Sequence, residues 1–151
     1  MMRRPVMAMM VLALGACSGQ NPTQKPSMPQ LALQPILYPD MTQNKLYGPA
    51  CNFVAANGGM GAVFLAQADR GILKLDDHVV IIPLASDGAT LPQGAHTHYA
   101  GPLYAATLRP APGSAPKARG ALIILRGHLS ITDAKAQPVY DADGDIQCRP
   151  S

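Results

Sequence analysis

Short apolar runs separated by turn residues dominate the chain from about residue 51 to residue 148. The runs are rich in Val, Ile and Leu, whereas Gly, Asp, Asn and Pro gather between them. Runs of this kind are typical of strands, and none continues a helical period without Gly or Pro for about ten residues. We expect about eight strands, with the seventh bent at Gly127, at 52–55, 62–66, 72–75, 78–82, 95–100, 103–109, 121–132 and 139–148. This spacing predicts an all-β sandwich or barrel.

Two stretches carry turn residues, one between these runs and one within the last of them. Residues 110–120 contain three prolines and two glycines, which predict a mobile loop. Asp143-Gly144 is a favoured pair at the centre of a two-residue hairpin. We therefore interpret Asp143 and Gly144 as a turn within the last segment.

The segment before the strands has a different composition. Residues 18–46 are rich in Ser, Gln, Asn and Pro and show no sustained period of 2 or 3.6. Such a segment cannot bury enough apolar surface to order itself, so residues 17–46 are expected to be a flexible tether. The run 31–38 is more apolar and can lie against the domain surface. The folded domain is expected to span 47–151.

The first seventeen residues resemble the signal of a bacterial lipoprotein. Arg3 and Arg4 precede an apolar run, which ends in the lipobox-like sequence Leu14-Gly15-Ala16-Cys17. The run is shorter than the roughly 20 residues that a membrane-spanning helix needs. The resemblance implies that residues 1–16 are removed and that Cys17 carries acyl chains, which anchor the protein to a membrane. Ser18, rather than Asp, follows the cysteine and is compatible with the outer membrane, facing the periplasm.

Assigning Cys17 to lipid leaves Cys51 and Cys148. Two cysteines of an exported chain most often pair in an oxidising compartment. A Cys51–Cys148 disulfide would join the first strand to the last, which favours a small closed antiparallel barrel over a sandwich.

The charge balance of the chain argues against nucleic-acid binding. Loss of Arg3 and Arg4 leaves 10 Lys and Arg residues against 9 acids, so the net charge falls from +3 to +1. This balance offers no basic face for nucleic acid. All the acids are aspartate, which favours turns over helix interiors.

Few residues offer recognisable chemistry. His96 and His98 are two residues apart and would share one face of a strand, but a metal site needs at least one more ligand, so no metal is expected. Asp141-Ala142-Asp143-Gly144-Asp145 resembles a calcium loop, yet it lacks the glycine and glutamate positions of an EF-hand. No serine lies in a nucleophile motif. We expect no catalytic residues and no cofactor.

The layout resembles the membrane-bound inhibitors of C-type lysozyme, small bacterial lipoproteins with an eight-stranded barrel. The shared features are the lipobox and tether, a cysteine at each end of the domain, and a loop element in which Gly94 and Ala95 match and Tyr99 comes two residues late. Gln93 stands where the family has serine, and Tyr104 and Arg109 keep the spacing of a tyrosine and a basic residue. The resemblance implies a barrel and a partner-binding surface formed by these six residues.

Together these observations predict a lipid-anchored, non-enzymatic binding or protein-interaction module of the bacterial envelope. Two alternatives stay open: inhibition of C-type lysozyme, and a structural envelope lipoprotein without a soluble ligand. The contact surface is expected at residues 86–99 and Arg109, because loops held by a rigid scaffold are where recognition residues usually lie.

Overall fold

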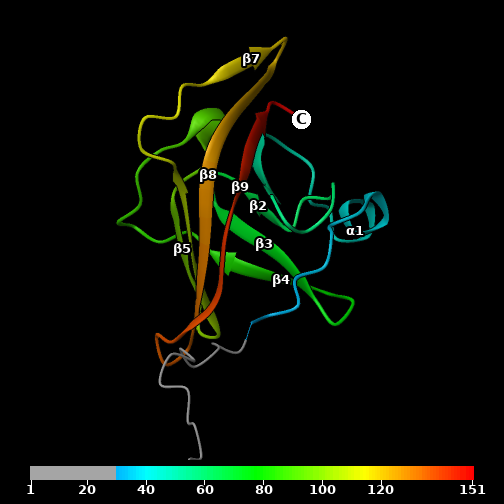
Figure 1. Ribbon diagram of the computed structural model, residues 1–151. Coiled ribbons are helices and arrows are strands. Elements are labelled where there is room, and N and C mark those ends of the chain that lie inside the picture. Colours follow the sequence, from blue (N-terminus) through cyan, green and yellow to red (C-terminus); the bar gives the residue numbers. More distant parts are fainter. Residues whose placement is uncertain (1–29) are drawn as a thin grey trace, which may run out of the picture.

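The computed structural model describes residues 30–151, and the expected signal peptide, Cys17 and residues 17–29 of the expected tether lie outside this range. Within it, one antiparallel sheet is curled into a nearly closed barrel (Figure 1). The elements are α1 (Tyr38–Gln43), β1 (Ala50–Ala55), β2 (Phe64–Ala66), β3 (Arg70–Leu75), β4 (His78–Pro83), the 3₁₀ turn η1 (Pro92–Gly94), β5 (His98–Ala100), β6 (Tyr104–Pro110), β7 (Lys117–Arg119), β8 (Leu122–Asp133) and β9 (Pro138–Arg149).

Eight strands follow one another in the order β4-β3-β2-β1-β9-β8-β6-β5, and β7 pairs with β8 beside this path. The two ends of the order meet where Leu84 bridges Tyr99 and the Ala85 amide donates to the His98 carbonyl at 3.2 Å. The all-β class and the barrel expected from the sequence are confirmed. Closure leaves few strand edges open, which protects the sheet against pairing with other chains.

The disulfide between Cys51 and Cys148 is confirmed. These two residues are direct partners in the β1–β9 ladder, and both are fully buried. The cross-link therefore lies inside the sheet, where it joins the first strand of the barrel to the last.

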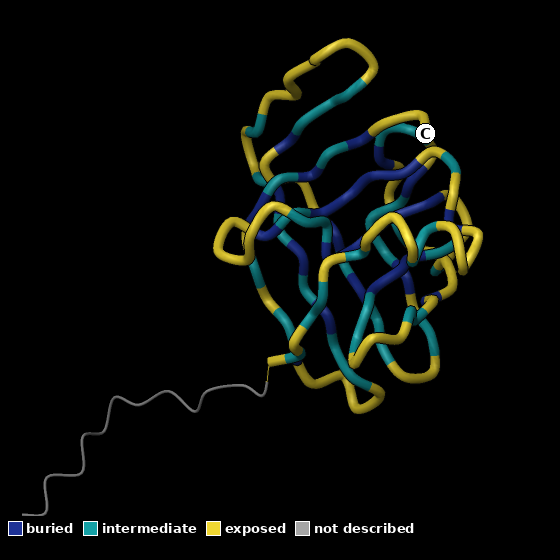
Figure 2. Tube along the Cα trace, turned by 90° about the vertical axis from the view of Figure 1, so that its right-hand side faces the viewer, coloured by how far each residue is buried: buried dark blue, intermediate teal, exposed yellow. Residues whose placement is uncertain are grey.

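Alternation along the strands fills the barrel with apolar side chains, and the buried parts of the trace run through its middle (Figure 2). Phe64 and Tyr99 pack edge to face at the centre, with ring centroids 5.9 Å apart. Gly71 makes this contact possible, because a Cβ there would lie 2.6 Å from the Phe64 ring. The tyrosine hydroxyl donates to the Gln67 carbonyl at 2.5 Å and accepts from the His96 amide at 2.9 Å.

Residues 30–46 are not a flexible spacer, so this part of the expected tether is corrected. Ile36, Met41 and Leu46 cover an outward apolar patch formed by Leu65 and Ile72 of β2 and β3. The run 31–38 lies against the domain, as its composition suggested. Because its apolar residues fit a patch rather than one face of a helix, their spacing shows no period.

The short helix α1 is held by one carboxylate. Asp40 accepts a hydrogen bond from the Leu37 amide at 2.8 Å and forms an ion pair with Lys74 of β3 at 2.9 Å. The Leu37 hydrogen bond first, and then the Lys74 ammonium, hold the pKa of Asp40 below its ordinary value of 3.8. The sequence analysis missed this helix because it is only six residues long and starts at Tyr38-Pro39.

The turn prediction at Asp143-Gly144 is wrong, and the loop prediction for residues 110–120 is right only outside β7. Asp143 and Gly144 lie within the continuous strand β9, opposite His128 and Gly127 of β8. Gly144 is needed there for close packing rather than for a turn, since a Cβ would clash with the Val54 carbonyl oxygen of β1. Residues 110–120, expected to be a mobile loop, contain β7 and are tied to β8 by the Ala111 amide, which donates to the Arg126 carbonyl at 2.8 Å.

Candidate functional site

A row of polar side chains crosses the outer face of β6, β8 and β9. Arg109, His128 and Asp143 are successive partners across the three strands, and Thr107, Ser130 and Asp141 form the next row. Residues between them, such as Leu108 and Leu129, are fully buried because alternate residues point to opposite faces. The same alternation that builds the core therefore places these polar groups together outside it.

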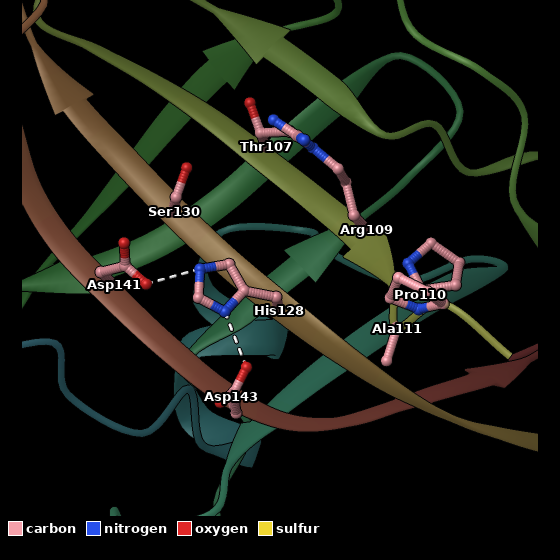
Figure 3. Close-up of a pocket in the computed structure, with 9 residues that line it drawn as sticks. Thr107, Arg109, Pro110, Ala111, His128, Ser130, Asp141 and Asp143 are labelled. Atoms are coloured by element: carbon pink, nitrogen blue, oxygen red, sulfur yellow. Dashed lines mark hydrogen bonds and ion pairs between the residues drawn. The ribbon is translucent and has the colours of Figure 1, made fainter. Parts of the chain in front are cut away.

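His128 is held between two carboxylates (Figure 3). Its Nε2 lies 2.5 Å from Asp141 Oδ1, and its Nδ1 lies 2.8 Å from Asp143 Oδ1. Each ring nitrogen of His128 therefore faces one carboxylate, and the ring is held from both sides. The side chain of His128 is 40% exposed, and the ring is accessible to a ligand.

These residues line a hollow of about 520 Å³ that is walled on one side by residues 110–112. The Arg109 side chain extends along β6 toward Thr107 (Figure 3). Arg109 forms no ion pair within the described residues, whereas His128 is paired on both sides. The hollow thus presents a free guanidinium beside a fixed histidine and two carboxylates.

This arrangement does not suit nucleophilic catalysis. Ser130 lies two residues from His128 on the same face, but both ring nitrogens of the histidine already contact carboxylates. No ring nitrogen is left to accept the hydroxyl proton, which a serine nucleophile requires. The site is better suited to hydrogen bonding and charge recognition.

No group of three or more His, Cys, Asp or Glu side chains within residues 30–151 is arranged to hold a metal ion. His98 instead contacts Asp87, with Nδ1 2.6 Å from Oδ1. The hydrogen bond from His98 lowers the pKa of the Asp87 carboxyl. Asp141, Asp143 and Asp145 lie along an extended strand rather than around a loop, and Asp145 pairs with Arg126 at 2.7 Å.

The six residues expected to form the contact surface do not lie on one surface of the structure. Only Arg109 reaches the hollow. Gln93 and Gly94 lie in η1 with left-handed φ values of 62° and 75°, and Gly94 is exposed. Tyr104 is partly buried against the core.

Ala95 and Tyr99 are fully buried, so we correct their assignment as contact residues. The Tyr99 ring points into the barrel, where its hydroxyl bonds two backbone groups. Ala95 precedes β5 and Tyr99 lies within it, so this segment runs along the core and is not a projecting arm. The sequence could not show this direction because the residues around Tyr99 are short, polar or both.

Sequence reasoning missed His128, Asp141 and Asp143 as partners. Their signal was the spacing of two between Asp141, Asp143 and Asp145, which is the strand period. The adjacent glycine favoured a turn and hid that period. The pairing with His128 depends on the β8–β9 register, which composition does not reveal.

Comparison with protein-family models, curated protein sequences and solved structures finds no match to this chain. Among residues 30–151, no helix combines the length and apolar character needed to cross a bilayer.

Proposed function

We propose that this protein is a lipid-anchored lipoprotein of the bacterial envelope that acts as a non-enzymatic binding module. The lipobox-like sequence ending at Cys17 supports the anchor, and Ser18 supports an outer-membrane position facing the periplasm. The polar hollow around Arg109 and His128 is its contact surface for a protein partner. A barrel with a buried cross-link supplies a rigid base for such a surface.

The observation that carries the proposal is the free Arg109 guanidinium beside His128 and its two carboxylates. A guanidinium offers five donors in a fixed fork and binds carboxylates strongly. The carboxylates next to it can receive donors from the partner. A preformed surface with both signs of charge favours selective recognition of a protein.

The anchor is tested by fractionating cells that express the full chain or Cys17→Ala. The intact chain is expected in the membrane fraction, and the variant is expected in soluble form without acyl chains. A variant that still fractionates with membranes through another attachment would contradict the assignment of Cys17.

The contact surface is tested by capture from detergent-solubilised envelope extract on the immobilised chain. Arg109→Ala and His128→Gln should each reduce capture of the same partner, whereas Lys135→Gln at the β8–β9 turn should not. Equal capture by the unmodified chain and all three variants would contradict the assignment of the hollow as the contact surface. If no partner is captured at all, the structural lipoprotein without a soluble ligand becomes the better account.

Inhibition of C-type lysozyme is the second candidate, supported by the barrel and by the disulfide that joins its first and last strands. Of the residues that the resemblance implicates, Arg109 and Gly94 are exposed, while Ala95 and Tyr99 are buried. A turbidity assay with lysozyme and bacterial cells tests this candidate. Inhibition that Arg109→Ala abolishes would support it, and full lysozyme activity at micromolar protein would exclude it.

A further inference from the structure

A second charged surface lies where β7 and the first residues of β8 form a projecting hairpin (Figure 1). Lys117 and Arg119 are two residues apart on β7 and therefore share a face. Together with Arg126 of β8 they line a hollow of about 430 Å³, whose floor includes Ile124 and Leu125. Asp145 is the one carboxylate among its lining residues.

The charges of this hollow are not balanced. Arg126 pairs with Asp145 at 2.7 Å, whereas Lys117 and Arg119 form no ion pair with any described residue. Both of these side chains are exposed. Three cations and one anion facing a shared space favour an anionic ligand, which an arginine fork can bind through two parallel hydrogen bonds.

The hairpin is also held in place. The Ala111 amide donates to the Arg126 carbonyl at 2.8 Å, and the Arg126 amide donates to Ser114 Oγ at 2.9 Å. These contacts tie both sides of the connecting segment to one residue of β8. Holding the backbone of the connecting segment beforehand lowers the entropy that this segment loses when a ligand binds.

We propose that the face formed by Lys117, Arg119 and Arg126 binds carboxylate groups of an anionic polymer, namely the peptide-bearing glycan of the cell wall. The choice of polymer rests on the proposed membrane anchor. The Leu31 amide bonds the Val139 carbonyl at one end of β9, and the hairpin lies at the other end, beyond the Ile123–Cys148 pair. The hairpin therefore lies at the end of the domain opposite Leu31, where it is free to contact a polymer beyond the proposed anchor.

Sedimentation with insoluble cell-wall sacculi tests the proposal, using the full chain purified in a non-ionic detergent. The chain is expected to pellet with sacculi at about 50 mM salt and to be released as salt rises toward about 200 mM, since exposed charges are screened. Lys117→Gln/Arg119→Gln removes two cations and should weaken binding at least about tenfold, because the loss of one charge-assisted hydrogen bond alone has about that effect. The matched control Lys45→Gln/Lys135→Gln changes net charge equally and should pellet like the unmodified chain.

Two further sedimentation experiments identify the ligand. Sacculi whose carboxylates have been converted to amides should no longer bind, and mixed micelles containing phosphatidylglycerol should not compete. Competition by those micelles would assign the face to lipid phosphates and contradict the proposal that it binds the cell-wall polymer. Absence of pelleting, or equal loss in both double variants, would overturn the site itself. The assay needs no anchored protein, so its failure is distinguishable from a failure of the Cys17 assignment.

Discussion

Gly127 of β8 and Gly144 of β9 lie directly opposite each other in the ladder between the two longest strands. Each is buried, and each stands where a Cβ would meet another part of the barrel. At Gly144 the obstacle is backbone, the carbonyl oxygen of Val54. At Gly127 the nearest obstacle is the end of the Ile146 side chain, and the Arg109 carbonyl oxygen would lie 2.9 Å from the added Cβ. The pair lets β8 and β9 approach the neighbouring strands closely.

This difference predicts which of two substitutions lowers the free energy of unfolding more. Gly144→Ala should lower the free energy of unfolding by more than about 3 kcal/mol, because overpacking against backbone cannot be relieved by a rotamer change. Gly127→Ala should cost about 1–3 kcal/mol, because Ile146 can move partly away and the Arg109 carbonyl oxygen, at 2.9 Å, is farther than the Val54 oxygen is at Gly144. Urea unfolding followed by far-UV circular dichroism measures both. Equal losses, or a larger loss for Gly127→Ala, would mean that the close approach of β1 to β9 is not the limiting contact.

The buried hydroxyl of Tyr99 predicts a second stability effect. Tyr99→Phe keeps the ring contact with Phe64 but leaves the Gln67 carbonyl and the His96 amide without this partner. We expect a loss of about 1–3 kcal/mol in the free energy of unfolding, the usual cost of unsatisfied buried polar groups. Tyr104→Phe is the matched control, and its effect should be smaller because no hydrogen bond of the Tyr104 hydroxyl is involved.

Tyr99 also predicts a response to alkaline pH. Burial raises its pKa from 10.0 to about 12. Because the folded state holds the phenolic proton more tightly than the unfolded state, this contribution to stability is complete below pH 10 and is lost as pH rises through about 12. Ultraviolet titration of tyrosinate should show a late step that is missing from Tyr99→Phe. A complete tyrosine titration near pH 10 in the folded protein would contradict this.

How much of this structure follows from the sequence depends on whether the signal is local. The short apolar runs of β3, β4, β6 and β8 predict strands, and the two remaining cysteines predict the cross-link that joins β1 to β9. Asp143-Gly144 was misread because its glycine is required by a neighbouring strand, a relation that the local sequence does not contain. The same applies to His128, whose partners are set by the strand register.

The packing of residues 30–46 illustrates the same limit. Ile36 and Leu46 lie in a proline-rich segment whose apolar residues show no period, and the outward patch on β2 and β3 explains how they pack. The prediction for Tyr99 is wrong in the opposite direction, because its neighbours suggest an exposed contact residue and its side chain is buried in the core. In both cases the deciding contacts are long-range, so residue type and spacing predict the strands better than the surfaces.

Acid should loosen α1 before the barrel unfolds. The pKa of Asp40 is lowered by the Leu37 amide and by Lys74, so its contribution is present above pH 3.8 and is lost as pH falls through the lower folded value. Hydrogen exchange at Asn44 and Leu46 should therefore rise below pH 3.8, while exchange in β9 stays slow. Asp40→Asn should exchange quickly at these two amides already at neutral pH. Unchanged protection in that variant would show that the apolar patch alone holds the segment.

The cross-link should contribute most of its stability through the unfolded state. Cys51 and Cys148 are 97 residues apart, and closing a loop of that length stabilises by about 4–5 kcal/mol in chain-entropy theory. Cys51→Ala/Cys148→Ala is expected to lose several kcal/mol of unfolding free energy and to unfold at lower urea without reducing agent. The unmodified chain should approach the same midpoint after reduction. A double variant as stable as the oxidised chain would contradict this role.

Photo-crosslinking in the cell tests most directly whether the hollow contacts a partner. A photoreactive residue at Thr107, which lines the hollow beside Arg109, should give one discrete adduct that Arg109→Ala removes. The same probe at Lys135, on the β8–β9 turn, should not give that adduct. If Thr107 gives no adduct, or if both positions give the same adducts regardless of Arg109, the hollow is not the contact surface of this protein.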